Sequence, residues 1–177
     1  TGIIYEEEYA ELDKTIYGMN DTRNDAAATL DWALLTRDGQ VLKSGCQAAE
    51  LPANASIPLA EVNLEGIAFD PAQTVFRARL YRGSEQVNET RYFFAPFAEM
   101  AKQNADVTIE SRRLSDTAVE VTLTADRFVW MAHLAEPEGA TPDSNDFDLW
   151  PGETRRVIVS TTDPDYTPVL HWMGKED

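Results

Sequence analysis

Short runs of alternating apolar and polar residues, separated by turn residues, recur from one end of the chain to the other. One of the clearest covers 30–34, where Trp32 and the leucines on either side of it fall on one face of a predicted strand. Asp38-Gly39 follows as a turn, which predicts a β-hairpin. The alternative is a helix that begins near Ala26 with Asn24 as its cap, but the turn comes too soon for a helix of about 11 residues. The pattern favours the hairpin.

The same alternation predicts further strands on both sides of this hairpin. The candidates are 14–19, 55–64, 74–81 and 87–94 in the first half, and 107–111, 119–123, 127–134 and 154–161 in the second. Polar segments rich in Pro and Gly, such as 136–146, are predicted to be loops. No regular exchange of helical and extended patterns occurs, so we expect an all-β protein.

The length of the chain suits two sandwiches better than one. An immunoglobulin-type sandwich takes about 100 residues and about seven short strands, so 177 residues hold two sandwiches that are slightly shorter than usual. The character of the sequence changes after Phe94, where 96–104 is a brief segment with room for one helical turn. We therefore expect two tandem immunoglobulin-like β-sandwich domains, the first at 1–100 and the second at 101–177.

The composition is that of a folded, strongly acidic protein. Fifteen Lys and Arg residues against 31 Asp and Glu residues give a formal charge of −16, which argues against a nucleic-acid partner. No apolar run approaches the roughly 18 residues of a membrane span. The opening, 1–14, is acidic rather than basic and apolar, so it does not resemble a signal peptide, and the chain looks like an excised piece. Bacterial cytoplasm or periplasm is favoured, with the compartment left open.

Metal and cofactor chemistry find no support in the sequence. Cys46 is the only cysteine and is expected to be a buried thiol, while His133 and His171 are expected to be isolated structural residues. The segment 143–148 superficially resembles a calcium loop, but Phe147 stands where an oxygen ligand belongs, so a polar turn is favoured. We expect no metal and no cofactor.

Catalytic residues are not expected either. The chain has no Gly-x-Ser-x-Gly elbow, phosphate loop or dinucleotide fingerprint, and its carboxylates are expected to be solvated. Three segments match the glycosylation acceptor pattern, at Asn20, Asn54 and Asn88, and we favour their interpretation as turn residues.

Among the four tryptophans, one is a candidate binding residue. Trp32 and Trp130 are expected in the core. Trp150 precedes Pro151-Gly152 in a predicted loop, so its ring is expected to be exposed or to meet a neighbouring surface. We therefore name Trp150 as a possible sugar or domain-interface contact, the alternative being that it caps the end of a sandwich.

Several segments, taken in order, resemble a known family. The resemblance rests on 17–22 with 30–34, on 51–56, on 92–100 and on 144–149 with Pro151-Gly152-Glu153. They resemble the C-terminal sandwich domains of β-mannosidases of glycoside hydrolase family 2, across about four fifths of the chain. The family pattern usually reads Ser-Asp-Asn at the last turn, whereas here Asn145 precedes Asp146, so the choice between mannosidase and exo-β-glucosaminidase stays open.

The resemblance implies a non-catalytic role for this chain. In such enzymes two catalytic glutamates lie on an upstream β/α barrel, and this chain contains no barrel, so the fragment itself is expected to be inert and its parent a glycosidase. Its expected work is to pack on and support the barrel of the same parent chain, whose substrate would be a β-mannoside. An independent carbohydrate-binding module and a tandem immunoglobulin-like adhesion fragment are the alternatives.

Overall fold

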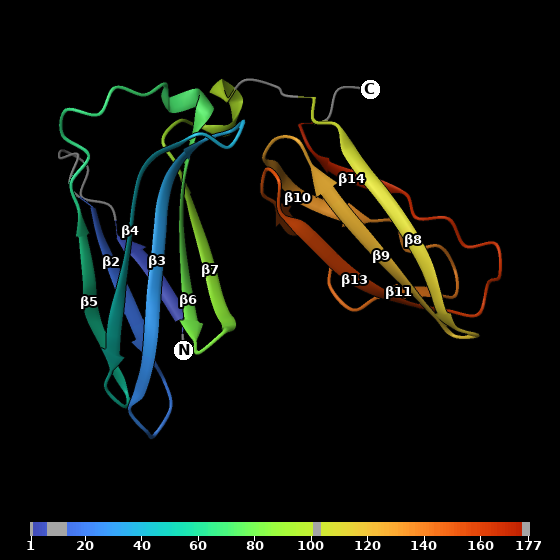
Figure 1. Cartoon of the computed structure of the whole chain (residues 1–177), viewed down its shortest axis with the longest axis horizontal. Helices are drawn as coiled ribbons and strands as arrows, with labels where there is room; N and C mark the ends of the chain where they lie inside the picture. Colours follow the sequence, from blue (N-terminus) through green and yellow to red (C-terminus); the bar gives the residue numbers. More distant parts are fainter. Residues whose placement is uncertain (1, 7–13, 101–103, 175–177) are drawn as a thin grey trace. The chain divides into compact units, whose positions relative to one another are not determined.

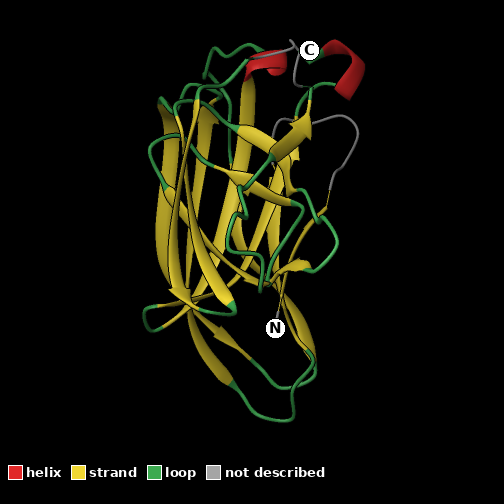
Figure 2. Ribbon diagram, turned by 90° about the vertical axis from the view of Figure 1, so that its right-hand side faces the viewer, coloured by secondary structure: helices red, strands yellow, loops and turns green. Residues whose placement is uncertain are grey.

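The computed structural model describes residues 2–6, 14–100 and 104–174, and within them the protein is built from antiparallel β-sheets (Figures 1 and 2). The only helical elements of these residues are two 3₁₀ turns, η1 at Pro71–Gln73 and η2 at Phe97–Glu99. The all-β expectation is therefore confirmed. Part of the acidic opening, 7–13, and part of the expected connecting segment, 101–103, lie outside the described residues.

Contacts between residues divide the chain into two units. The first comprises Thr1–Thr36 and Gln40–Met100, and the second comprises Arg37–Gly39 and Ala101–Asp177. Each unit contains two of the four sheets and its own cluster of buried apolar side chains. The fold is thus a tandem of sandwiches, as expected, and the two units are described separately below.

The first unit pairs a three-stranded sheet with a four-stranded one (Figure 1). The smaller sheet has the order β1 (Gly2–Glu6), β2 (Lys14–Asn20), β5 (Ala55–Val62), and the larger sheet has the order β4 (Val41–Leu51), β3 (Ala26–Thr36), β6 (Thr74–Arg82), β7 (Glu85–Phe93). The segment at Ala26 is extended and pairs with Leu51, so the helical alternative for it is wrong. Strand β1 was not expected, because 1–14 was interpreted as an acidic opening, although Ile3, Ile4 and Tyr5 are residues that favour strands.

The core of the first unit lies between these sheets and is organised around Trp32. Its side chain is 8% exposed and stacks on Phe76, with the ring centroids 5.9 Å apart, so the core prediction for Trp32 is confirmed. Gly45 pairs with Trp32 across the β3/β4 ladder, and a Cβ there would lie 2.6 Å from the indole ring. The glycine therefore leaves the space that the ring occupies.

The second unit is assembled from shorter strands (Figure 1). One sheet has the order β11 (Ala140–Pro142), β13 (Thr154–Thr161), β9 (Ala118–Ala125), β8 (Val107–Ser115), and the other has the order β12 (Phe147–Leu149), β10 (Val129–Leu134), β14 (Leu170–Met173). The sequence pattern did not predict β11 or β12. Each has three residues, too few for an alternation to stand out, and β11 lies inside the expected loop.

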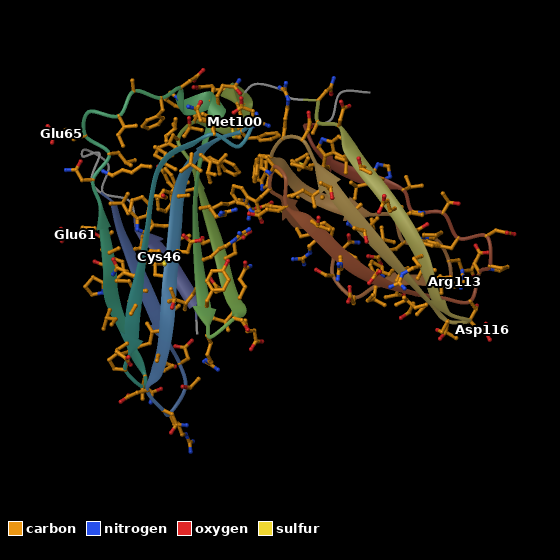
Figure 3. All side chains as sticks on the ribbon, in the orientation of Figure 1. Cys46, Glu61, Glu65, Met100, Arg113 and Asp116 are labelled. Carbon is orange, nitrogen blue, oxygen red and sulfur yellow. The ribbon has the colours of Figure 1, made fainter. Side chains whose placement is uncertain are left out.

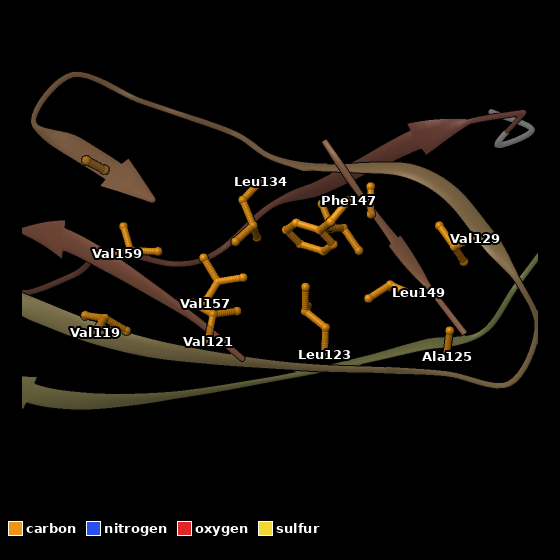
Figure 4. Close-up of a cluster of buried hydrophobic side chains, with 13 residues drawn as sticks. Val119, Val121, Leu123, Ala125, Val129, Leu134, Phe147, Leu149, Val157 and Val159 are labelled. Atoms are coloured by element: carbon orange, nitrogen blue, oxygen red, sulfur yellow. The ribbon is translucent and has the colours of Figure 1, made fainter. Parts of the chain in front are cut away.

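Strand alternation places the core of the second unit between its two sheets (Figure 4). Valines and leucines of β9 and β13 on one side face Ala132, Leu134, Phe147 and Leu149 on the other. Strand β10 carries a bulge after Val129. From Val129 to Ala132 it advances three residues, while its partner β12 advances only two, from Leu149 to Phe147. Met131 lies in this bulge with φ of 52°. The bulge matters for the surface, because it reverses which side chains of β10 face outward.

Candidate functional site

The acidic turn at 143–148 is held in place by its own side chains. The backbone N–H of Asp143 donates to the Ile158 carbonyl at 2.8 Å, and the Ile158 N–H donates to Asp143 Oδ1 at 3.0 Å, which continues the β11/β13 pairing by one step. Arg155 donates to the Ser144 hydroxyl at 2.8 Å, and its guanidinium lies 4.8 Å from the centre of the Phe147 ring. Side-chain bonds thus attach the start of the turn to β13.

Asn145 and Asp146 attach the same turn to β10. The Leu134 N–H donates to Asn145 Oδ1 at 2.7 Å, and Asn145 Nδ2 donates to the Leu134 carbonyl at 2.9 Å, so the amide replaces a strand partner in both directions. Nδ2 also donates to a carboxylate oxygen of Glu136 at 2.8 Å. Asp146 has φ of 56°, and its Oδ1 lies 3.1 Å from His133 Nδ1. These contacts require an amide at position 145, which both accepts from and donates to Leu134, and a carboxylate at position 146, which faces His133.

These bonds identify 143–146 as a polar turn, as expected, whereas Phe147 and Asp148 of the expected turn begin β12. Asp143, Asn145 and Asp148 each accept a backbone N–H, so their oxygens already serve the fold. Among the described residues, no group of three or more His, Cys, Asp or Glu side chains is arranged to hold a metal ion. The turn therefore offers no preformed calcium site.

The expectation that the two histidines are isolated from each other is wrong. His133 of β10 and His171 of β14 are direct partners in the antiparallel pairing of these strands. The pairing was hidden because the residues are 38 positions apart in the sequence and because the bulge at Met131 changes the face on which His133 lies. Cys46 belongs to the other unit.

Trp150 is a buried residue rather than an exposed one. Its side chain is 4% exposed, and its ring centroid lies 4.6 Å from that of Phe128 at an interplanar angle of 47°. In this arrangement the ring has no open face for a sugar to stack on. The expected contact of Trp150 with a sugar or a domain interface stays a prediction. Trp130 is half-buried and does not belong to the core cluster of the second unit, so the core expectation for it is wrong, and Trp172 is half-buried as well.

The expectation of a buried Cys46 is wrong, because its thiol is exposed on β4 (Figure 3). The pairing of Trp32 with Gly45 puts the glycine on the core side, and the next residue of a strand faces the other way. Cys46 accordingly lies opposite Asp31, on the outer face of the sheet. The sequence around it is too poor in apolar residues to reveal this orientation.

The three glycosylation-like asparagines have different surroundings. Asn20 ends β2, is fully buried and donates to two backbone carbonyls, so it is closed to modification in the folded protein. Asn88 lies within β7 rather than in a turn. Only Asn54 occupies an exposed turn, between β4 and β5, with φ of 48°. The turn interpretation is thus right for Asn54 and wrong for Asn88. It holds in part for Asn20, which ends a strand but whose Oδ1 accepts the Thr22 N–H at 3.1 Å and so shapes the turn that follows.

The fold defines the class of this protein, a tandem of immunoglobulin-like sandwiches, and comparison with known proteins narrows it. Residues 14–98 match the family model of the Mannosidase Ig/CBM-like domain. The match covers most of the first unit, so the resemblance to mannosidase sandwich domains is confirmed there. A comparison with curated protein sequences finds no match.

Solved structures similar to the chain come from much longer enzymes. The β-D-mannosidase from Dictyoglomus thermophilum aligns with a TM-score of 0.79 at 22% identity, over 97% of this chain and 21% of the mannosidase. An exo-chitosanase from Amycolatopsis orientalis aligns with a TM-score of 0.60 at 15% identity, over 97% of this chain and 25% of that one. At such identities the likeness establishes the fold alone. The chain spans between a fifth and a quarter of these enzymes.

Within the described residues there is no helix both long and apolar enough to cross a membrane.

Proposed function

We propose that the chain is the non-catalytic accessory region of a larger glycoside hydrolase resembling a β-mannosidase. Its two domains, 1–100 and 101–177, pack on the catalytic barrel of the same parent protein and support it. The observation that carries this proposal is the alignment of 97% of the chain, through both units, with one fifth of a β-D-mannosidase. The family match of 14–98 adds a sequence argument for the first domain.

The burial of the tryptophans favours this role over an independent sugar-binding module. Such a module needs an exposed aromatic platform, whereas Trp32 and Trp150 are buried and the other two tryptophans are half-buried. A tandem adhesion fragment stabilised by calcium is disfavoured for a different reason, because the oxygens of the acidic turn already accept backbone N–H groups. A supporting role demands only folded sandwiches with a core of their own, and each unit has such a core.

Hydrolysis of two substrates tests the assignment. A retaining glycosidase needs two carboxyl groups about 5 Å apart in a sugar pocket, so the 177-residue chain alone is expected to hydrolyse neither an aryl β-mannoside nor an aryl β-glucosaminide. The full-length parent is expected to hydrolyse one of them, and which one decides between mannosidase and exo-β-glucosaminidase. Turnover by the chain alone would overturn the accessory role.

Calorimetric titration with mannobiose separates the supporting role from the sugar-binding one. The expected result is no saturable heat. Saturable binding would favour the binding module, and a Trp150→Ala variant would then tell whether its ring takes part. In the parent enzyme, a Trp32→Ala substitution is expected to lower thermal stability while KM of the residual folded enzyme stays unchanged, because Trp32 supports the first domain rather than the substrate.

A further inference from the structure

The outer face of the small sheet in the second unit carries a pair of imidazole rings. His133 of β10 and His171 of β14 are direct cross-strand partners, and the next pair along, Leu134 with Leu170, is buried in the core. Because alternate residues of a strand face opposite sides, both histidines point away from the core. The His133 side chain is 40% exposed and His171 is exposed, so solvent reaches both.

This placement suits the binding of one metal ion by both rings. Directly opposed residues of an antiparallel pair have Cβ atoms about 4.5–5.5 Å apart, a separation from which two imidazole rings can converge on one ion. Imidazole is a favoured ligand of copper, nickel and zinc, and affinity generally rises toward Cu²⁺ along the first-row divalent ions. The bulge at Met131 creates the pair, since without it His133 would share the inward face of Val129.

Asp146 gives one of the rings a fixed orientation. Its Oδ1 lies 3.1 Å from His133 Nδ1, so the carboxylate accepts a hydrogen bond from a ring protonated at Nδ1. The lone pair then remains on Nε2, at the outer end of the ring. A carboxylate behind a histidine is a frequent arrangement around protein-bound metals, where it orients the ligand and raises its basicity. Asp146 would act as a positioning residue, not as a ligand.

We propose that His133 and His171 form a two-imidazole binding site for a divalent transition-metal ion of the copper and nickel type, with Asp146 orienting His133. The described residues offer no group of three or more acidic, His or Cys side chains arranged for a metal, so water completes the coordination sphere and the ion exchanges readily. The site is independent of the mannosidase-like role. It would equip the accessory region to bind metal whether or not the parent enzyme is a mannosidase.

The probe is CuCl₂, added to the full 177-residue chain without an affinity tag and followed by calorimetry and electron paramagnetic resonance. We expect one Cu²⁺ bound with two imidazole nitrogens. His171→Asn is expected to weaken binding about tenfold or more, because it removes one arm of a chelate, and to leave a single-nitrogen spectrum. His171 is exposed, so this variant should fold normally, which a thermal melt checks. His133→Asn should behave in the same way.

Two further variants separate the imidazole site from general attraction to an acidic protein. Met173→Leu changes an exposed residue two positions along β14, on the same face as His171, and should leave Cu²⁺ affinity unchanged. Asp146→Asn should lower affinity about tenfold while two nitrogens remain in the spectrum, as expected of an orienting residue. The double variant His133→Asn/His171→Asn keeps all 31 acidic residues. If it binds Cu²⁺ as tightly as the unchanged chain, carboxylates hold the ion and the proposal fails.

Discussion

The two units reach the same kind of sandwich by different means. In the first unit the hairpin strands β3 and β4 have 11 residues each, and their ladder continues with one irregularity along the hairpin. In the second unit β11 and β12 have three residues each, and the acidic turn between them is attached through side chains such as Asp143 and Asn145. Long strands secure their register by backbone pairing and buried apolar faces. Short strands need side chains to complete their pairing.

This difference predicts where each unit is vulnerable. The first unit should respond most strongly to truncation of a large apolar side chain, and the second to loss of a single amide that replaces backbone partners. Hydrogen exchange followed on peptides of each unit separates the two responses, because the chain need not unfold in a single two-state transition.

Trp32→Ala should have the largest effect. The substitution removes a buried ring that stacks on Phe76, and such truncations cost about 3–5 kcal/mol. Denaturant unfolding measures the loss, and faster exchange in peptides of β3 and β6 locates it. The matched control is Val41→Ala, which shortens an exposed side chain of the neighbouring strand β4 and should cost less than about 0.5 kcal/mol. A loss below about 1 kcal/mol for Trp32→Ala would mean that the ring does not organise the core.

Asn145→Ala should destabilise the second unit by about 2–3 kcal/mol. It removes two bonds to Leu134 and one to Glu136, and it leaves the Leu134 N–H and carbonyl without their partner. Exchange should accelerate in peptides of β10 and β12 and stay unchanged in those of β3. Asn145→Asp is a graded control, because it keeps the acceptor for the Leu134 N–H and loses both donated bonds. Equal stability of all three proteins would show that the amide is not needed to hold the turn.

Gly45→Ala tests the close approach of backbone and ring in the first unit. A Cβ at this position would lie 2.6 Å from the indole of Trp32, so either the ring or β4 must move, at a cost of about 1–2 kcal/mol. Ser44→Ala is the matched control, since Ser44 precedes it on the same strand and is exposed. If both variants unfold at the same denaturant concentration, β4 can shift without cost, and the position of the Trp32 ring does not require glycine at 45.

The sequence was sufficient wherever a strand alternates without interruption. The hairpin around Trp32 and the strand β13 were both predicted from that pattern, with ends within a few residues of those observed. The burial of Trp32 followed directly, because its face was fixed by the neighbouring leucines. The same pattern predicted an all-β protein, and the length predicted room for two sandwiches.

The failures share a cause, which is pairing between residues far apart in the sequence. A bulge at Met131 moves His133 to the outer face, where it meets His171, and no local pattern reveals either event. The exposure of Cys46 depends on the partner of Gly45 across the sheet. Whether a loop residue such as Trp150 is buried, as it is against Phe128, is also decided by tertiary packing and not by the turn signal beside it. Spacing along the chain cannot supply these contacts.

The smallest expected effect concerns a hydroxyl in the second unit. Tyr166 packs against the core of that unit, and its hydroxyl is buried with no hydrogen-bond partner among the described residues. Burial raises the pKa of Tyr166 above its usual value of about 10. The unfolded chain therefore loses this proton more readily than the folded one, and the contribution of Tyr166 to stability is full below pH 10 and falls as the pH rises further.

Tyr166→Phe keeps the packed ring and removes the unpaired hydroxyl. At pH 7 it should change the free energy of unfolding by less than about 1 kcal/mol, in the stabilising direction, because the hydroxyl forms its hydrogen bonds to water only in the unfolded chain. The stability advantage of the variant over the unchanged protein should increase between pH 10 and pH 11, since Tyr166 has a hydroxyl proton to lose and the phenylalanine of the variant has none. Melting curves of the two proteins at each pH measure this difference and cancel the titration of all other groups. A variant less stable than the unchanged protein at pH 7 would mean that the hydroxyl has a bonding partner after all, and that polar contacts secure this unit at Tyr166 as they do at Asn145.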